Sequence, residues 1–340
     1  MAARFRQDDI RPGRFEGLKL EAAAVDIATL AAQRAGFVEV NCPACGGADS
    51  LPAFEKHGFA FRQCPACRTV FMSPRATPQM LAEFYRDSAL YAFWNRHIFP
   101  ASQEARRQNI VIPRVRRILG MCQAHGVDGD LLVEVGAGYG TFCAEMAGRG
   151  RFARVLAVEP NQELAATIRA SGVEVLERSV EDLGGRGLAA DVVVAFEVLE
   201  HLHAPRDFLT ACAGLLKPGG LLVVTCPNYL GFEIATLGPL SDSVDHEHIN
   251  LFNPDSLAGL AERCGFLVLE CQTPGELDAD MVRLKALAGE LDLSAQPFLR
   301  AVLLECWDEL GGPFQEFLKA RRLSSHMWLA ARRTGGEVAR

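Results

Sequence analysis

Two cysteine pairs with matched spacing are the clearest chemistry-bearing feature of this 340-residue sequence. Cys42-Pro-Ala-Cys45 and Cys64-Pro-Ala-Cys67 give the pattern C-x2-C-x18-C-x2-C. Each pair can form a tight knuckle that points two thiolates at one ion, and two knuckles complete the tetrahedron of a structural Zn²⁺. Because four thiolates leave no coordination position open, we expect zinc to fold this segment rather than to catalyse. Reduced or redox-active dithiols and a rubredoxin-like iron centre are the alternatives.

A glycine-rich turn follows a short apolar run later in the chain. The run LLVEV leads into residues 136–140, GAGYG, and a helix is expected to follow. Glycines between a strand and a helix let a ligand approach backbone N–H groups closely. Glu159 ends the next apolar run, where a carboxylate can accept hydrogen bonds from both hydroxyls of a ribose. The spacing Gly-x-Gly-x-Gly, without a Gly-Lys-Ser/Thr sequence, favours a nucleoside ligand over NAD or ATP.

Four successive motifs carry a family resemblance. EVGAGYG, VLAVEP, DVVVAFEVLEHLHAP and LLKPGGLLVVTCPN resemble those of class I S-adenosylmethionine-dependent methyltransferases over residues 131–273. The resemblance implies that the glycines wrap the methionine part, that Glu159 holds the ribose and that residues 179–180 lie near the adenine. The family often has Asp where this chain has Ser179. The cofactor-binding residues implied in this way are Glu134, Gly136, Ala137, Gly138, Gly140, Glu159, Pro160, Ser179, Val180, Phe196 and Glu197.

A zinc ribbon in front of such a domain resembles the sugar methyltransferases of deoxysugar and surface-polysaccharide pathways. Their C-methyltransferases act on nucleotide-linked keto sugars and carry a Tyr-x-Glu-His motif. Glu247 and His248 match its Glu-His half, whereas Asp245 stands at the tyrosine position. This resemblance implies a small-molecule acceptor: a sugar, nucleotide-linked or part of a polysaccharide, or a similar small polar metabolite.

Two histidine-containing segments offer a base for a hydroxyl or carbon-acid acceptor. In the segment DHEH (245–248), His248 is the first choice, Glu247 orients it or contacts a sugar hydroxyl, and His246 is a further candidate. The alternative is that His248 only anchors its loop. In EVLEHLH (197–203), His201 either orients the cofactor or acts as the base.

Other functions remain open at this point. Ubiquinone-pathway O-methyltransferases share the EVLEH motif, and there Glu197, Glu200 and His201 would bind a divalent cation, so O-methylation of a phenolic or quinone-like metabolite is the second hypothesis. A non-catalytic zinc-ribbon scaffold is the third, which the intact glycine turn and Glu159 argue against. Methylation of protein or RNA is the fourth, and the acidic charge disfavours RNA.

The pattern of apolar runs predicts the elements that position these residues. Runs beginning at residues 131, 155, 173, 191, 221 and 266 alternate with helical segments, which is typical of a parallel sheet covered on both faces. Residues 326–333 are expected as a final edge strand. Helices are expected over 18–36, 78–99, 101–124, 161–172 and 206–220. The predicted fold is α/β, a Rossmann-like doubly wound seven-stranded sheet with an N-terminal zinc-binding module and a helical C-terminal insertion.

The same features divide the chain into expected domains. Residues 1–40 form an N-terminal helical segment, 41–76 the zinc-binding module, 77–125 a helical linker or substrate lid, and 126–340 the methyltransferase domain. A helical insertion is expected over 274–324. It forms a substrate cap, a homodimer surface or ordinary core.

Composition limits partners and location. The formal net charge is -7 and the sequence pI about 5.7, so no nucleic-acid partner is expected. No apolar run reaches the ~20 residues that span a bilayer, and the N-terminus has no apolar signal core. Single cysteines in apolar stretches indicate a reducing compartment, so we expect a cytoplasmic protein with no membrane partner. Five arginines in the 101–124 helix are interpreted as a solvated face, with a phosphate-binding face as the alternative: Arg106, Arg107, Arg114, Arg116 and Arg117.

Overall fold

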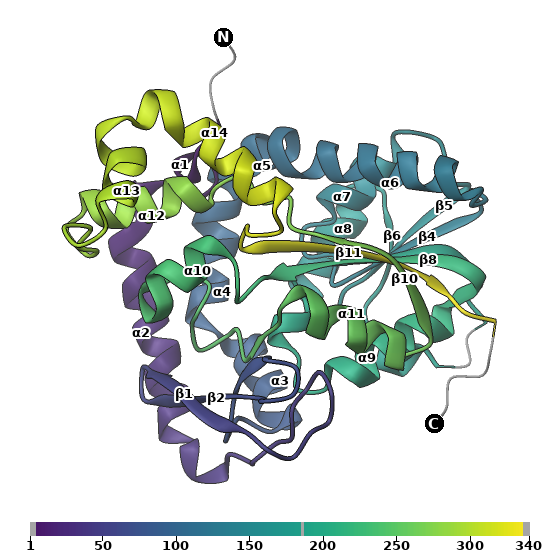
Figure 1. Cartoon of the computed structure of the whole chain (residues 1–340). Helices are drawn as coiled ribbons and strands as arrows, with labels where there is room; N and C mark the ends of the chain where they lie inside the picture. Colours follow the sequence, from purple (N-terminus) through teal and green to yellow (C-terminus); the bar gives the residue numbers. More distant parts are fainter. Residues whose placement is uncertain (1–4, 185–186, 336–340) are drawn as a thin grey trace. The chain divides into compact units, whose positions relative to one another are not determined.

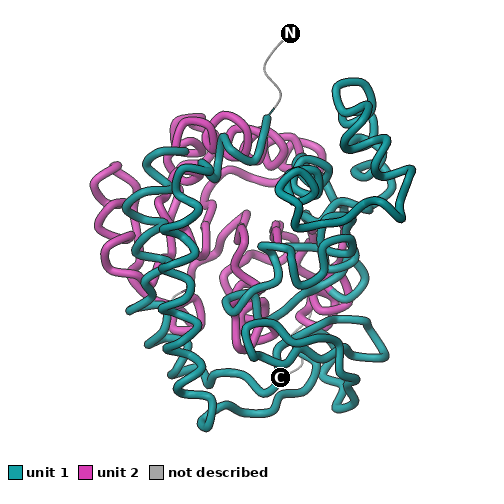
Figure 2. The backbone as a smooth tube through the Cα atoms, turned by 90° about the vertical axis from the view of Figure 1, so that its left-hand side faces the viewer, with its two compact units in different colours: residues 1–102, 227–256, 272–328 teal, residues 103–226, 257–271, 329–340 magenta. Residues whose placement is uncertain are grey.

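The computed structural model describes residues 5–184 and 187–335 and divides into two compact units. Unit 1 comprises the residues up to 102, 227–256 and 272–328, and unit 2 comprises 103–226, 257–271 and the residues from 329 onward (Figure 2). Each unit therefore combines segments far apart in the sequence. The four domains expected from the sequence stay a prediction.

A seven-stranded sheet confirms the predicted Rossmann-like α/β fold. Its strands are β4 (Leu131–Val135), β5 (Arg154–Val158), β6 (Glu174–Leu176), β7 (Ala190–Phe196), β8 (Leu216–Pro227), β10 (Phe266–Gln272) and β11 (His326–Arg333). They lie in the order β10-β11-β8-β7-β4-β5-β6, and the pairs β6/β5, β5/β4, β4/β7 and β7/β8 are parallel. Their near-continuous apolar sequence follows from burial on both faces.

Helices cover both faces of this sheet. α6 (Ile112–His125), α7 (Thr141–Ala147) and α8 (Gln162–Ala170) lie on one side, and α9 (Pro205–Leu215) and α11 (Pro254–Arg263) lie on the other (Figure 1). The short 3-10 turns η5 (Glu181–Leu183) and η6 (Leu199–His201) follow β6 and β7. This doubly wound arrangement leaves the loops after β4, β5 and β7 at the carboxyl ends of parallel strands, where α/β folds bind ligands.

Two expectations for the sheet need correction. Residues 326–333 form a strand, but β11 lies between β10 and β8 rather than at the edge, and its central residues 327–331 are buried. The helix expected over 206–220 ends at Leu215, because Leu216 already pairs with Ala190 and begins β8.

Unit 1 is built around a small antiparallel sheet and a long helix. The sheet has the order β1-β2-β3-β9, formed by β1 (Leu51–Lys56), β2 (Phe59–Gln63), β3 (Val70–Met72) and β9 (Asn250–Leu251). The helix α2 (Glu16–Ala32) packs beside α4 (Ala89–Phe93) (Figure 1). Side chains from α2, the sheet, α3 (Pro78–Asp87) and residues 234–251 share one apolar core. The core thus ties the segment around β9 to the N-terminal residues.

The helix expected over 78–99 is divided. Thr77 caps α3 by accepting a hydrogen bond from the backbone of Met80, and Ser88 caps α4 in the same way through Tyr91. The chain continues through η3 (Trp94–Ile98), α5 (Phe99–Arg106) and η4 (Arg107–Val111) into α6. A serine inside an apolar-patterned stretch starts a new helix here because its hydroxyl satisfies an orphan N–H group.

The remaining helices of unit 1 include those between β10 and β11. These are α12 (Asp278–Leu287), α13 (Pro297–Arg300), η8 (Ala301–Glu305) and α14 (Trp307–Ala320), and α10 (Phe232–Leu237) packs with them in a second apolar core. Leu303 is buried in that core, whereas Leu284 and Leu287 are exposed. Among the residues described, no helix combines the length and apolar character that crossing a membrane requires.

Candidate functional site

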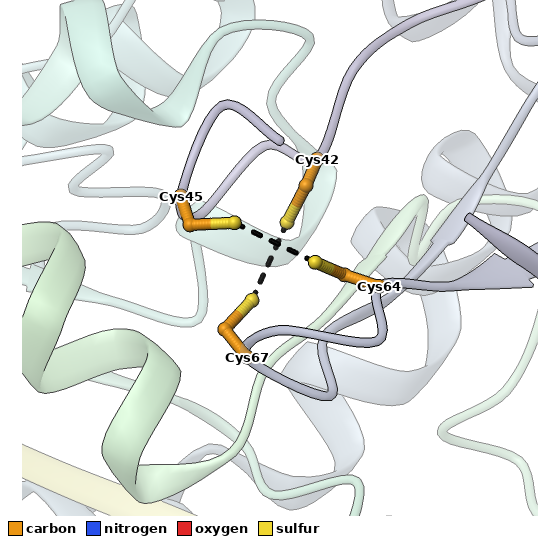
Figure 3. Close-up of side chains that lie close together, drawn as sticks. All are labelled: Cys42, Cys45, Cys64 and Cys67. Atoms are coloured by element: carbon orange, nitrogen blue, oxygen red, sulfur yellow. Dashed lines mark hydrogen bonds between the residues drawn. The ribbon is translucent and has the colours of Figure 1, made fainter. Parts of the chain in front are cut away.

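The four paired cysteines converge on one point in unit 1. Figure 3 shows their side chains directed toward a common centre, two from the loop before β1 and two from the loop between β2 and β3. The sulfur atoms of Cys42 and Cys67 lie 3.4 Å apart and those of Cys45 and Cys64 3.5 Å apart, and all four lie within 4.8 Å of one another. Such a donor set fits one tetrahedral thiophilic ion.

The two cysteine loops share one backbone turn. The N–H of Gly46 donates to the carbonyl of Cys42, and the N–H of Arg68 donates to that of Cys64, at 2.8 and 2.9 Å. Gly46 and Arg68 both have positive φ, 78° and 60°. The repeated turn explains why each Cys-Pro-Ala-Cys sequence presents both thiols on the same side.

The segment that follows the sequence DHEH (245–248) is fastened to this cysteine module. β9 pairs with β3, and the buried Arg75 donates through Nη1 to Asn250 Oδ1 at 2.7 Å. Asn253 Nδ2 donates to the carbonyl of Cys67 at 2.9 Å. Folding of the module therefore fixes the chain on the carboxyl side of residues 245–248.

Asp245 shapes the histidine segment itself. Its Oδ1 accepts hydrogen bonds from the backbone N–H groups of Glu247 and His248, both at 2.8 Å. Burial would raise the pKa of Asp245, but His248, His246 and the backbone donors outweigh burial and lower it. Asp245 thus closes a turn, which gives the residue at the tyrosine position of the sugar-enzyme motif a structural role of its own.

The three residues after Asp245 point to different surroundings. His248 is partly buried, and its Nδ1 lies 2.9 Å from the carbonyl oxygen of Ser243. His246 is only 4% exposed and packs edge-on against Phe84 at 5.9 Å between ring centroids. Glu247 is also buried, and burial together with Asp245 raises the pKa of its carboxyl well above the usual range.

In unit 2, the glycine turn needs glycine for two separate reasons. Gly136, Gly138 and Gly140 all have positive φ, at 73°, 54° and 68°. A Cβ atom on Gly136 would lie 2.6 Å from Cγ2 of Val198, and one on Gly140 would lie 2.8 Å from Ile168. Around Gly138 no atom of the described chain lies within 4 Å of the Cβ position. The two ends of the turn, Gly136 and Gly140, are therefore packed against side chains, and its middle, Gly138, is open. A turn that cradles a ligand needs this arrangement.

Glu159 joins the glycine turn to the next helix. Its carboxylate accepts hydrogen bonds from the N–H of Gly138 at 2.8 Å and the N–H of Asn161 at 2.9 Å. The side chain is 5% exposed, and burial raises its pKa above the usual value. Each oxygen accepts one of these bonds and has a second lone pair that a ribose hydroxyl can use. Pro160, next in the chain, is exposed.

Glu134 lies buried beneath the same turn, with 4% of its surface exposed. Burial raises its pKa to about 8, against the opposing effects of Cys143 and Arg114. At neutral pH such a carboxyl is largely protonated and uncharged. It would ionise when a cation such as an amino-acid ammonium binds beside it.

An arginine that the sequence interpretation placed on a solvated face sits at the end of β7. Arg114 is partly buried, its guanidinium lies 4.5 Å from the ring centroid of Phe196, and its Nη2 lies 3.3 Å from Glu197 Oε1. Thr225 donates to the same oxygen at 2.5 Å. The solvated-face interpretation is therefore wrong for Arg114. Arg107 and Arg117 also form ion pairs, with Glu145 and Glu270.

Glu197 carries backbone strain at this position. Its φ is 55°, an uncommon value for a residue other than glycine, and such strain is found disproportionately at ligand sites. Because its carboxylate is bound by Arg114 and Thr225, it is committed to organising the end of β7 rather than presented for a cation. The EVLEH motif itself gave no indication that Arg114 binds Glu197, because the two residues lie 83 positions apart in the sequence.

The other residues that the family resemblance implies for cofactor binding lie in the glycine turn or at the ends of β6 and β7. Ser179 is partly buried and donates to Asp182 Oδ2 at 2.9 Å, while Val180 is buried after β6. Ala137 is buried within the glycine turn, and Phe142 packs edge-on against Phe196. His201 ends η6 and is half-buried.

Comparison with known proteins gives consistent results. A family model described as a methyltransferase domain matches residues 104–271. The chain is 30% identical over 207 residues to a probable S-adenosylmethionine-dependent methyltransferase of Mycolicibacterium smegmatis, covering 60% of this chain and 74% of that one. It is 34% identical over 151 residues to a ubiquinone biosynthesis O-methyltransferase of Xanthomonas axonopodis pv. citri, covering 40% of this chain and 62% of the relative.

Among solved structures, the chain resembles the 1,6-didemethyltoxoflavin-N1-methyltransferase of Burkholderia thailandensis. The TM-score is 0.46 and the sequence identity 17%, with 84% of this chain and 99% of that chain covered.

Proposed function

The chain belongs to the S-adenosylmethionine-dependent methyltransferases, and we propose that it methylates a sugar, nucleotide-linked or part of a polysaccharide, or a similar small polar metabolite. The observation that supports the acceptor class is the Asp245–His248 turn, which holds the partly buried imidazole of His248 just before β9, the strand that pairs with β3 of the four-cysteine module. An imidazole nitrogen can accept a hydrogen bond from a hydroxyl of such an acceptor.

We further propose how unit 2 holds the cofactor, whose sulfonium supplies an electrophilic methyl group. The open middle of the turn at Gly138 admits the methionine part, and Glu134 balances its ammonium. Glu159 accepts the ribose hydroxyls while keeping the turn in place. Phe196 and the strained Glu197 line the site from the end of β7, and Ser179 and Val180 lie on the adenine side.

Methyl transfer requires a base and an in-line alignment of the acceptor atom with the methyl group. The acceptor atom forms a bond to the methyl carbon while the carbon–sulfur bond breaks, and the sulfur leaves as a neutral thioether. The proton on the acceptor must therefore pass to a base, for which we propose His248. Donation from Nδ1 to the Ser243 carbonyl places the ring proton on Nδ1 and makes Nε2 the basic nitrogen. In-line positioning supplies much of the remaining acceleration.

We propose a structural Zn²⁺ at the four cysteines, one per chain. The convergence of the four sulfur atoms supports it. A cytoplasmic location and a homodimer formed through residues 274–324 stay predictions.

O-methylation of a phenolic or quinone-like metabolite is the second candidate. The similarity to a ubiquinone biosynthesis O-methyltransferase favours it, although the match covers only 40% of this chain. A cation at Glu197, Glu200 and His201 receives less support, because Glu197 is bound by Arg114 and Thr225.

Methyl-labelled S-adenosylmethionine distinguishes the two acceptor classes. The full chain is incubated with a panel of nucleotide-linked sugars, including keto sugars, and with a panel of catechols and polyprenyl phenols. We expect label in a sugar product with the wild-type protein and less label with Glu159→Ala at a limiting cofactor concentration. Label confined to phenolic products would overturn the sugar assignment and leave the methyltransferase assignment intact.

A further inference from the structure

We propose that Asp26, His246 and Glu247 form a second metal site in unit 1, which takes a divalent transition ion such as Mn²⁺, Fe²⁺ or Zn²⁺. All three side chains are buried, and each offers one ligand atom within 4.8 Å of the other two. They come from α2 and from the Asp245–His248 turn, 220 residues apart in the sequence, so only the folded chain assembles them.

His246 is the observation that points to a ligand. It is 4% exposed, and within residues 5–184 and 187–335 neither Nδ1 nor Nε2 has a hydrogen-bond partner. A buried polar group without a hydrogen-bond partner carries a free-energy cost. Its neighbour Phe84 packs against it in a T-shaped arrangement and has no nitrogen or oxygen atom in its side chain that could pair with an imidazole nitrogen. A metal bound to one nitrogen would remove part of this cost.

Asp26 is oriented by hydrogen bonds, as carboxylates that bind metals in proteins usually are. Its Oδ2 accepts hydrogen bonds from Ser88 Oγ at 2.6 Å and Leu90 N at 3.0 Å, and its Oδ1 accepts one from Ala89 N at 2.8 Å. These donors fix the carboxylate and, in the described chain, leave Oδ1 with a second lone pair. Asp26 is also the one charged residue in the apolar stretch 22–33, a signal that sequence reading passed over.

Glu247 adds a second carboxyl beside the first. An oxygen of its carboxyl group lies within 4.8 Å of a carboxylate oxygen of Asp26 and of a ring nitrogen of His246. A divalent cation between them would supply the positive charge that two neighbouring carboxylates need. The hydroxyl of Tyr85 lies 3.5 Å from the Glu247 carbonyl and holds the backbone here.

The donor set selects the kind of metal. One imidazole and two carboxylates suit first-row divalent ions such as Mn²⁺, Fe²⁺ and Zn²⁺, whereas Mg²⁺ and Ca²⁺ prefer oxygen ligands alone. Three protein ligands leave coordination positions open, in contrast to the four cysteines. The open positions would take water or an oxygen atom of a bound small molecule.

Manganese tests the site separately from the cysteines, because four thiolates select zinc and disfavour the hard Mn²⁺. Full-length protein carrying zinc, stripped of weakly held metal, is titrated with MnCl₂ while the electron paramagnetic resonance signal of free Mn²⁺ is followed. We expect one Mn²⁺ per chain with a micromolar Kd, and a nitrogen hyperfine coupling from one imidazole. If the site arrives filled with zinc, elemental analysis will give two zinc ions per chain.

Substitutions then assign the ligands. His246→Gln and Glu247→Gln should each weaken Mn²⁺ binding at least ~10-fold, while His97→Gln, at an exposed histidine of unit 1, leaves it unchanged. Thermal denaturation followed by circular dichroism checks that the variants fold. The nitrogen hyperfine coupling is measured on the wild-type protein and so does not depend on any variant. The proposal is overturned if wild-type protein binds neither Mn²⁺ below ~1 mM nor a second zinc, if the bound Mn²⁺ shows no nitrogen coupling, or if a folded His246→Gln protein binds it equally well. None of these readouts depends on methyl transfer.

Discussion

Glu134 shows what burial alone does to one carboxyl next to the glycine turn. Its pKa is raised from 4.5 to about 8, so between these values the folded protein retains a proton that the unfolded chain has released. The unfolded state then binds fewer protons, and stability falls as pH rises across this window. The contribution is fully present below pH about 4.5 and is lost by pH about 8.

Glu134→Gln removes this titration. Without cofactor, the free energy of unfolding of the wild-type protein should fall relative to the variant by up to ~1.4 kcal/mol per pH unit between about pH 5 and 8. Urea denaturation at several pH values measures the difference, with Glu163→Gln, at an exposed position of α8, as control. Parallel pH dependence of wild type and Glu134→Gln would contradict the buried, protonated state.

His248 is the residue on which the proposed proton transfer depends. His248→Gln should lower kcat by about 10²–10⁴, the usual cost of a lost base, and leave S-adenosylmethionine affinity nearly unchanged. Asp245→Asn should have a smaller effect, since an amide oxygen can still close the turn. Initial rates at saturating acceptor and calorimetric Kd values measure both. Full turnover by His248→Gln would move the search for the base to His201 or His203.

At the residue scale, the local geometry could be predicted where one short segment carries the whole signal. The cysteine knuckles and the glycine turn are local, and their backbone turns follow from their own residues. Arg114 and Asp26 could not be assigned, because their partners lie far along the chain and only the fold brings them together.

At the scale of elements, the cysteine module acts through the pairing of β3 with β9. Cys64→Ser should lose the metal, lower the melting temperature and loosen the segment before β9, so kcat should fall more than cofactor affinity. Metal analysis, calorimetry and rate measurements test this, with the exposed Cys306→Ser as the matched control. A Cys64→Ser protein that keeps its metal and its melting temperature would refute the role of the module.

Strands were easier to predict than helix ends. Short apolar runs mark strands, so six strands of the seven-stranded sheet could be read directly, five of which, β4 to β8, pair in parallel. The division of the helix at Ser88 could not be predicted, because it depends on Ser88 and on Asp26, which lies next to it in the fold. The place of β11 within the sheet could not be predicted either, because the order of strands in the sheet differs from their order in the sequence.

At the scale of the whole molecule, the α/β class followed from alternating strands and helices, but the composition of the units did not. Residues 227–256 belong with the N-terminal segment because β9 completes the small sheet and because residues 234–251 enter its core. Such long-range pairing leaves little trace in local pattern. The proposed cofactor-binding residues lie in unit 2, and the cysteine module and the Asp245–His248 turn lie in unit 1.

Calorimetric titration of the full chain with S-adenosylmethionine tests the central claim most directly. We predict one molecule bound per chain with a micromolar Kd, about -8 kcal/mol. Glu159→Ala should weaken binding at least ~10-fold, because it removes both the ribose acceptor and the bond that holds Gly138, while Glu163→Ala should not. Folded wild-type protein that binds no S-adenosylmethionine, or a Glu159→Ala variant that binds it as tightly as wild type, would contradict this account.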